Sequence, residues 1–94
     1  METEKTLVKK FVIKSQLGLH ARPAAILVRT ANRFRSDITI QKGKQKVNGK
    51  SIMGVMMLAA GPGTRITVHI SGPDAQKAMA EIEKLFDKEL HDEK

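Results

Sequence analysis

The chain has 94 residues, of which 40% are hydrophobic, and this predicts one small domain with a buried core rather than a disordered polypeptide. It contains no cysteine, which excludes disulfides and thiolate zinc sites, and no apolar run approaches the roughly 20 residues of a membrane-spanning helix. The start, METEKTLVKK, lacks the apolar region of a secretory signal, so we expect a cytoplasmic protein without membrane insertion. The formal net charge of +7 indicates a surface that attracts phosphates, acidic proteins or nucleic acid.

The first half of the chain alternates between strand and helix patterns. Residues 7–14 have the composition of a strand, which SQLG interrupts. From Ala21 the apolar residues recur at helical spacing until about Asn32. Residues 36–40 and 45–48 are predicted as two strands, joined by a hairpin turn over KGK.

The second half repeats the alternation with a shorter helix. Residues 51–58 are a compact helix candidate, and a loop over AGPG follows it. Residues 64–70 alternate strictly and predict a strand. A turn then supplies Asp74 as the N-cap of a long amphipathic helix that begins at Ala75.

The element order βαββαβα predicts an α+β fold, with a four-stranded antiparallel sheet covered on one face by three helices. The other face should meet water, because polar residues alternate outward from the predicted strands. They are Thr39, Thr67 and His69.

The stretch GLHARPAA, residues 18–25, places a histidine and an arginine at the predicted start of the first helix. Backbone N–H groups in a first helical turn lack intrahelical partners, and the helix dipole adds partial positive charge there. Pro23 fits that turn, and Arg22 adds a planar fork of donors that suits phosphate. The pattern predicts a phosphate pocket at the backbone amides of Ala21 and Arg22, with His20 as a nucleophile that forms a phosphohistidine. The alternative is that His20 only caps the helix.

No second catalytic set accompanies this histidine. His69 and His91 are remote in sequence and lack the spacing of metal ligands. A Ser-His-Asp set and a P-loop are also missing from the sequence. We therefore expect no metal and no cofactor, and a phosphoryl group that arrives from one protein and leaves to another.

Two motifs, LGLHARPAA and KSIMGVMML, closely resemble the HPr phosphocarrier family of the bacterial phosphotransferase system. The resemblance covers about residues 7–88 and implies that family's open-faced β-sandwich as a single domain over 1–94, with short charged tails. It implies a carrier rather than an enzyme, and we expect a monomer. His20 would accept phosphate on Nδ1 from enzyme I, with phosphoenolpyruvate as ultimate donor, and Arg22 would stabilise it. An EIIA domain would then receive the phosphoryl group.

Ser51 begins the second motif and has two possible roles. Its chemistry suits an N-cap, although Gly54 rules out a capping box. The resemblance implies regulatory phosphorylation by an HPr kinase/phosphorylase in hosts that have one. Because Ser51 and His20 each begin a helix, we expect them to lie near one another.

Three apolar residues share one side of this short helix by their spacing: Ile52, Met53 and Met56. Val55 and Leu58 fall on the other side. Such stripes are commonly core, but a chain this small cannot bury every apolar residue of the helix. Flexible methionine suits a surface that docks several partners. The resemblance implies that this helix, together with the helix after His20, docks enzyme I and EIIA domains.

Leu17 departs from the family, because relatives often carry a small polar residue three positions before the histidine. One possible hydrogen bond at the site is then lost, which would change the lifetime of the phosphohistidine. The net charge of +7 is also high for the family.

Two other functions remain open. One is a regulatory adaptor of a nitrogen-related or incomplete phosphotransferase system, which acts by phosphorylation-dependent binding. The other is a nucleic-acid binder, suggested by the basic charge. An aromatic content of 3%, all of it phenylalanine that we expect in the core, argues against nucleic acid as a partner.

Overall fold

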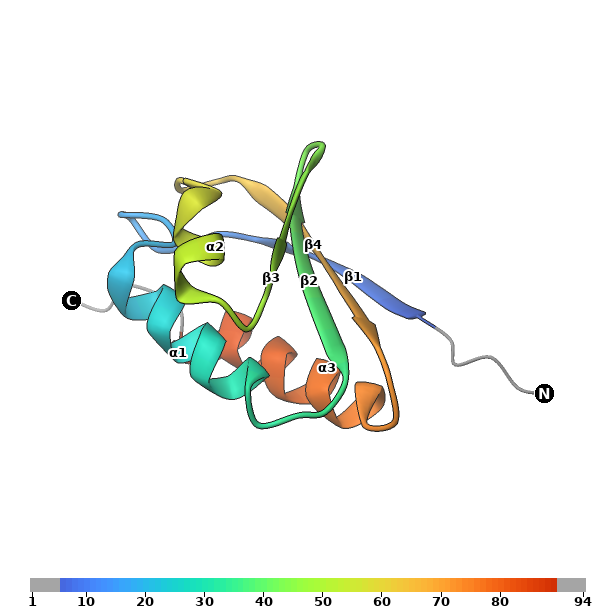
Figure 1. Cartoon of the computed structure of the whole chain (residues 1–94). Helices are drawn as coiled ribbons and strands as arrows, with labels where there is room; N and C mark the ends of the chain where they lie inside the picture. The colour runs from blue at the N-terminus through green and yellow to red at the C-terminus, as the bar shows by residue number, and fades with distance from the viewer. Residues whose placement is uncertain (1–5, 90–94) are drawn as a thin grey trace.

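A computed structural model describes residues 6–89 and places three helices on one face of a four-stranded antiparallel sheet, as the sequence predicts (Figure 1). The last helix continues into a π-helical turn, η1. In chain order the elements are β1 (Thr6–Val12), α1 (Ala21–Ala31), β2 (Asp37–Lys42), β3 (Gln45–Asn48), α2 (Ile52–Met57), β4 (Arg65–Ser71), α3 (Ala75–Lys84) and η1 (Leu85–Glu89).

The sheet has the strand order β1-β4-β2-β3, so β1 and β3 are its edges. Central strand β4 pairs with β1 on one side and with β2 on the other, and all three pairings in the sheet are antiparallel. Alternate residues of β4 point toward the helices and are buried, namely Ile66, Val68 and Ile70. The residues between them are half-buried on the open face, where His69 Nε2 lies 2.8 Å from the side-chain oxygen of Gln41.

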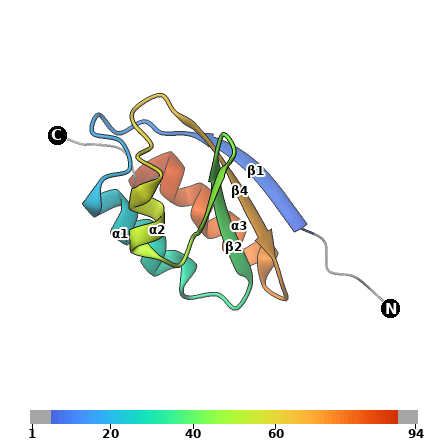
Figure 2. The same cartoon turned by 45° about the horizontal axis from the view of Figure 1, so that its top comes forward.

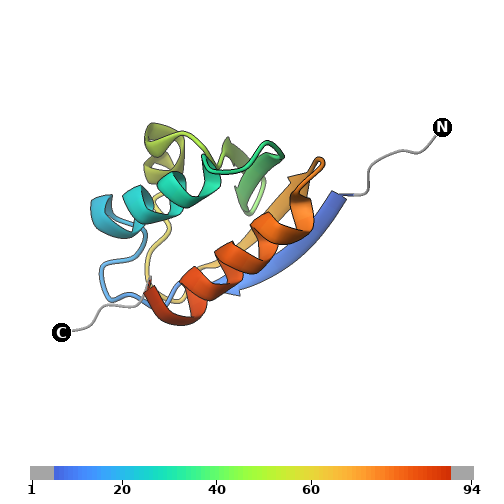
Figure 3. The same cartoon turned by 90° about the horizontal axis from the view of Figure 1, so that it is seen from below.

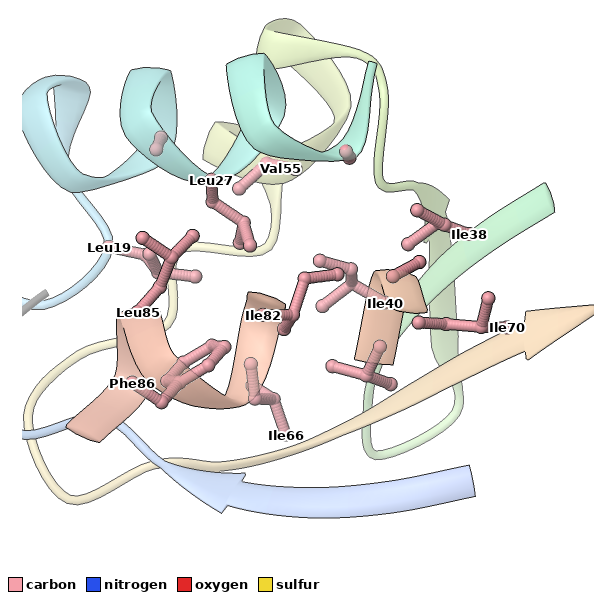
Figure 4. Close-up of a cluster of buried hydrophobic side chains, with 14 of the residues drawn as sticks. Leu19, Leu27, Ile38, Ile40, Val55, Ile66, Ile70, Ile82, Leu85 and Phe86 are labelled. Atoms are coloured by element: carbon pink, nitrogen blue, oxygen red, sulfur yellow. The ribbon is translucent and has the colours of Figure 1, made fainter. Parts of the chain in front are cut away.

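The core fills the space between this sheet and the helices. Leu27 of α1, Val55 of α2 and Ile82 of α3 are fully buried and converge on the isoleucines of β2 and β4 (Figure 4). Burial of each such side chain stabilises the fold by about 1.5–3 kcal/mol. Helices α1 and α3 run side by side in opposite directions across the sheet (Figure 3).

The prediction that all three phenylalanines belong to the core is only partly right. Phe86 is buried, and its ring stacks on Phe11 with the centroids 4.4 Å apart. Phe11 itself is half-buried because it belongs to the edge strand β1. Phe34 is half-buried in the loop after α1, beneath the guanidinium of Arg33.

The predicted N-cap position of Asp74 at the start of α3 is confirmed, but its side chain does not serve as the cap. Its carboxylate makes no capping hydrogen bond. It accepts hydrogen bonds from the Ser36 hydroxyl at 2.6 Å and from the backbone N–H groups of Arg35 and Ser36 at 3.0 Å. This contact forms because the turn before α3 packs directly on Ser36, where a Cβ on Gly72 would lie 2.5 Å from the hydroxyl oxygen. Asp74 therefore ties the loop after α1 to the start of α3.

These donors give the Asp74 carboxylate a measurable role in stability. The Ser36 hydroxyl, followed by the Arg35 N–H, lowers the pKa of Asp74 from 3.8 to about 2. A lowered pKa means that this stabilisation is complete above the unfolded value and is lost as the pH falls through the folded value.

We expect Asp74→Asn to lower the melting temperature at pH 7. The gap in melting temperature between this variant and wild type should narrow as the pH falls from 3.8 to about 2. Thermal unfolding of both proteins across this pH range measures the gap. Asp37→Asn, which changes an exposed carboxylate, is the matched control. A gap that stays constant with pH would contradict the assigned role of Asp74.

Candidate functional site

Helix α1 begins where the sequence predicts, with His20 at its N-cap. His20 is in an extended conformation, and its carbonyl accepts the first helical hydrogen bond from Ala24 at 2.9 Å. The imidazole makes no capping hydrogen bond, and the first turn of α1 contains no acidic residue. His20 therefore occupies the N-cap position, but the imidazole does not act as a cap for the first backbone amides of α1.

The imidazole itself is unusually placed. His20 is half-buried, and its Nε2 is enclosed without a hydrogen-bond partner in the described part of the chain. A buried polar atom without a partner costs about 1–3 kcal/mol, so few such atoms occur in folded proteins. Arg22 is exposed on the same first turn, and none of the ion pairs found within residues 6–89 involves it. The two predicted site residues thus share one helical turn.

The loop before His20 is held against the loop that follows α2. The backbone N–H of Leu19 donates to the carbonyl of Ala60 at 2.8 Å, and the Leu19 side chain is buried. Gly18 has a φ of 74°, and a Cβ there would lie 2.3 Å from the same carbonyl oxygen. Only glycine fits this close approach, which fixes where α1 starts.

Ser51 caps α2 as predicted. Its hydroxyl oxygen accepts a hydrogen bond from the Gly54 N–H at 3.0 Å, while the backbone of Ser51 is extended. The side chain is half-buried. The capping role predicted from the chemistry of serine is therefore confirmed. It does not bear on the regulatory role, which stays a prediction.

The expected proximity of Ser51 and His20 is wrong. Asn32, at the C-cap of α1, donates from its side chain to the carbonyl of Lys50 at 3.0 Å. Ser51 therefore lies beside the end of α1, whereas His20 lies at its start. Eleven helical residues separate the two ends, which corresponds to about 16 Å. The reason is that the short connection after β3 feeds α2 back along α1 in the opposite direction (Figure 2).

The predicted division of α2 into two sides is confirmed. Val55 and Leu58 are buried, whereas four apolar residues are exposed and form what we call the α2 apolar surface. They are Ile52 at 39%, Met53 at 68%, Met56 at 41% and Met57 at 67%.

One exposed apolar side chain of α2, that of Met57, was not predicted from the sequence. Met57 follows Met53 by four positions, and this helical spacing could have found it. Leu17 is 72% exposed in the loop before His20, and its apolar side chain offers no hydrogen bond there.

Residues 6–89 contain no group of three or more His, Cys, Asp or Glu side chains placed to hold a metal ion. Within the same range, none of the helices has the length and apolar character needed to span a membrane. His91 lies outside the described residues.

A family model described as the PTS HPr component phosphorylation site matches residues 7–88, so the chain belongs to the HPr family of the phosphotransferase system. Members of this family are phosphocarrier proteins rather than catalytic enzymes. The chain is 42% identical over 87 residues to the phosphocarrier protein HPr of Treponema pallidum, covering 93% of this chain and 99% of the relative. It is 49% identical over 81 residues to the HPr-like protein Crh of Halalkalibacterium halodurans, covering 86% and 96% of the two chains.

Solved structures share the fold. The crystal structure of HPr-C-His from Thermoanaerobacter tengcongensis superposes with a TM-score of 0.86 at 38% identity, covering 89% of this chain and 94% of the other. A crystal structure of the phosphocarrier protein HPr from Bacillus anthracis gives 0.81 at 43% identity, covering 86% and 96%. The open-faced arrangement of sheet and helices is therefore that of the HPr family.

We expect Gly18→Ala to destabilise the fold more than Gly43→Ala, which is its matched control. Both glycines have positive φ, but a Cβ on Gly43 would meet nothing within 4 Å. The left-handed backbone alone should cost about 1 kcal/mol at Gly43. The clash with Ala60 should add about 1–3 kcal/mol at Gly18. Urea unfolding of both variants measures the difference, and equal losses would contradict the close approach.

Proposed function

We propose that this chain is a histidine phosphocarrier that accepts a phosphoryl group on His20 from phosphorylated enzyme I and passes it to an EIIA domain. Phosphoenolpyruvate is the ultimate donor. The observation that carries this proposal is the half-buried imidazole at the N-terminus of α1, which it does not cap. Its Nε2 is enclosed, which supports Nδ1, the atom that the family resemblance implies, as the nucleophile.

The transfer step needs little beyond positioning and charge. The lone pair of Nδ1 forms a bond to phosphorus, and the bond between phosphorus and the donor atom of enzyme I breaks with its electron pair. The phosphoryl oxygens then meet the backbone N–H groups of Ala21 and Arg22 and the positive end of the α1 dipole. The guanidinium of Arg22, free of the ion pairs found in the described chain, adds charge-assisted hydrogen bonds. Transfer to EIIA reverses these bond changes.

In this proposal, enzyme I and the EIIA domain both dock on the neighbouring helix α2. We assign this docking to Ile52, Met53 and Met56, whose exposure supports contact with another protein. Ser51, at the start of the same helix, is the proposed substrate of an HPr kinase/phosphorylase. Ser51 lies beside the end of α1 and His20 at its start, and the helix between them is about 16 Å long, more than the Debye length of about 8 Å at physiological salt. A phosphate on Ser51 would therefore act on docking rather than on the imidazole directly.

A second candidate function is the regulatory adaptor of a nitrogen-related or incomplete phosphotransferase system, which binds partners according to its phosphorylation state. It is favoured by the similarity to the HPr-like protein Crh and to a solution structure described as the Bacillus subtilis catabolite repression HPr. An adaptor would bind its partners without passing the phosphoryl group to an EIIA domain, so onward transfer separates the two functions. One HPr from Thermoanaerobacter tengcongensis was solved as a dimer, and the monomeric state of this chain remains part of the proposal.

Incubation with enzyme I and phosphoenolpyruvate, followed by mass spectrometry, tests the carrier function. Wild type should gain one acid-labile phosphoryl group, and His20→Ala should gain none while remaining folded, because the imidazole makes no capping bond. Arg22→Ala should slow labelling about 100-fold, as expected for loss of one donor to the transferring group. Arg29→Ala, an exposed arginine in the last turn of α1, is the matched control and should label normally. Full labelling of His20→Ala would overturn the assignment.

A negative charge on α2 should weaken docking. Met53→Asp and Ser51→Asp should each raise the enzyme I concentration needed for half-maximal labelling, since the family's partner surfaces are expected to be acidic. The Ser51→Asp effect should shrink with rising salt. Its fold should persist because aspartate also caps helices, and Ser51→Ala should label almost normally.

Light scattering and thermal unfolding of each α2 variant provide the controls and also check the monomeric state. A loss of the folded state in Met53→Asp would mean that Met53 is needed for packing, despite its exposure. Equal labelling of wild type and Ser51→Asp at low salt would leave Ser51 as a helix cap only.

A further inference from the structure

The carbonyl of Gly18 is the shared acceptor of two hydrogen bonds in the loop before His20. The hydroxyl of Ser15 donates to it at 2.6 Å, and the backbone N–H of His20 donates to it at 2.9 Å. The Gly18 N–H returns a bond to the carbonyl of Ser15 at 3.1 Å. Ser15 is 1% exposed, so its hydroxyl is enclosed with this carbonyl.

The position of this carbonyl determines how His20 enters α1. Its hydrogen bond to the His20 N–H fixes the plane of the peptide group before His20. That plane, together with a φ of −84°, sets the direction in which the imidazole leaves the backbone. The same bond occupies the N–H of His20, so the first amides that can meet a phosphoryl group are those of Ala21 and Arg22.

Leu17 makes this indirect support more important. A polar side chain at position 17 could hold the imidazole from the loop, but Leu17 is 72% exposed and apolar. Within the described chain, neither ring nitrogen of His20 is found with a hydrogen-bond partner that would fix the ring. The orientation of the ring therefore depends on the backbone that carries it.

We propose that Ser15 is a positioning residue for phosphoryl transfer, which acts by holding the Gly18 carbonyl that orients the backbone of His20. The inference rests on the proposed role of His20 as phosphoacceptor. Removal of the hydroxyl leaves no unpaired donor, and the Gly18 carbonyl keeps the bond from His20. The cost to the fold should thus be small, whereas the geometry of attack should suffer.

Ser36 provides a matched control for loss of a buried hydroxyl. It is also 1% exposed and also donates a hydrogen bond of 2.6 Å, to Asp74, but it lies beyond the other end of α1. Ser36→Ala should lower the melting temperature at least as much as Ser15→Ala, because it also removes a donor to the Asp74 carboxylate and the acceptor of the Asp74 N–H. Only Ser15→Ala should affect the chemistry at His20.

Labelling by enzyme I and phosphoenolpyruvate tests the proposal. The measurement separates the maximal labelling rate from the enzyme I concentration that gives half of that rate. Ser15→Ala should lower the maximal rate about tenfold, which is less than the loss that a misplacement of 1 Å can cause. The enzyme I concentration for the half-maximal rate should not change. The hydrolysis rate of its phosphohistidine and the 15N shifts of the His20 ring should also change. Ser36→Ala should match wild type in all three readouts.

Ser15→Thr keeps the hydroxyl and should restore most of the rate. Ser15→Cys has a side chain of similar size that donates only weakly, so its maximal rate should fall between those of wild type and Ser15→Ala. This variant tests the donor even if the extra methyl of threonine does not fit. Wild-type labelling together with an unchanged maximal rate, hydrolysis rate and ring shifts in Ser15→Ala would overturn the positioning role. Absence of labelling in wild type would instead overturn the proposed function.

Discussion

Helix α1 is held at both ends by backbone carbonyls that flank α2, and the site depends on this arrangement. At the start of α1, the N–H of Leu19 bonds to Ala60 after α2; at its end, Asn32 bonds to Lys50 before α2. The two helices must therefore run antiparallel. This constraint places the start of α1, where His20 lies, beside the loop that follows α2.

Sequence patterns were sufficient for the elements of this fold and for the placement of His20, Arg22 and Ser51 at helix starts. Strict alternation in β4 and the 3.6-residue period of α3 follow from burial on one face, which a single sequence records directly. His20, Arg22 and Ser51 were found because helix starts have a recognisable chemistry. Their assigned roles in phosphoryl transfer and regulation remain proposals.

The contacts between segments that are distant in the sequence could not be predicted from the sequence alone. Asp74 has the residue type and position of an N-cap, yet its carboxylate binds the loop at Ser36, because the close packing at Gly72 brings stronger donors within reach. The separation of Ser51 from His20 was missed for a similar reason, since the direction of α2 depends on contacts at Lys50 and Ala60. The hydroxyl of Ser15 was also overlooked, because nothing local to its sequence shows that it is enclosed.

The separation of the two helix starts affects which modifications of this domain a partner protein could detect. A standard interface of about 800 Å² per partner is roughly 30 Å across, wide enough to cover both ends of α1 at once. A smaller footprint centred on one end would cover only that end. Under the proposed roles, a large partner would respond to the combined state of His20 and Ser51, whereas a small one would respond to a single mark. One domain of 94 residues could in this way carry two independent signals.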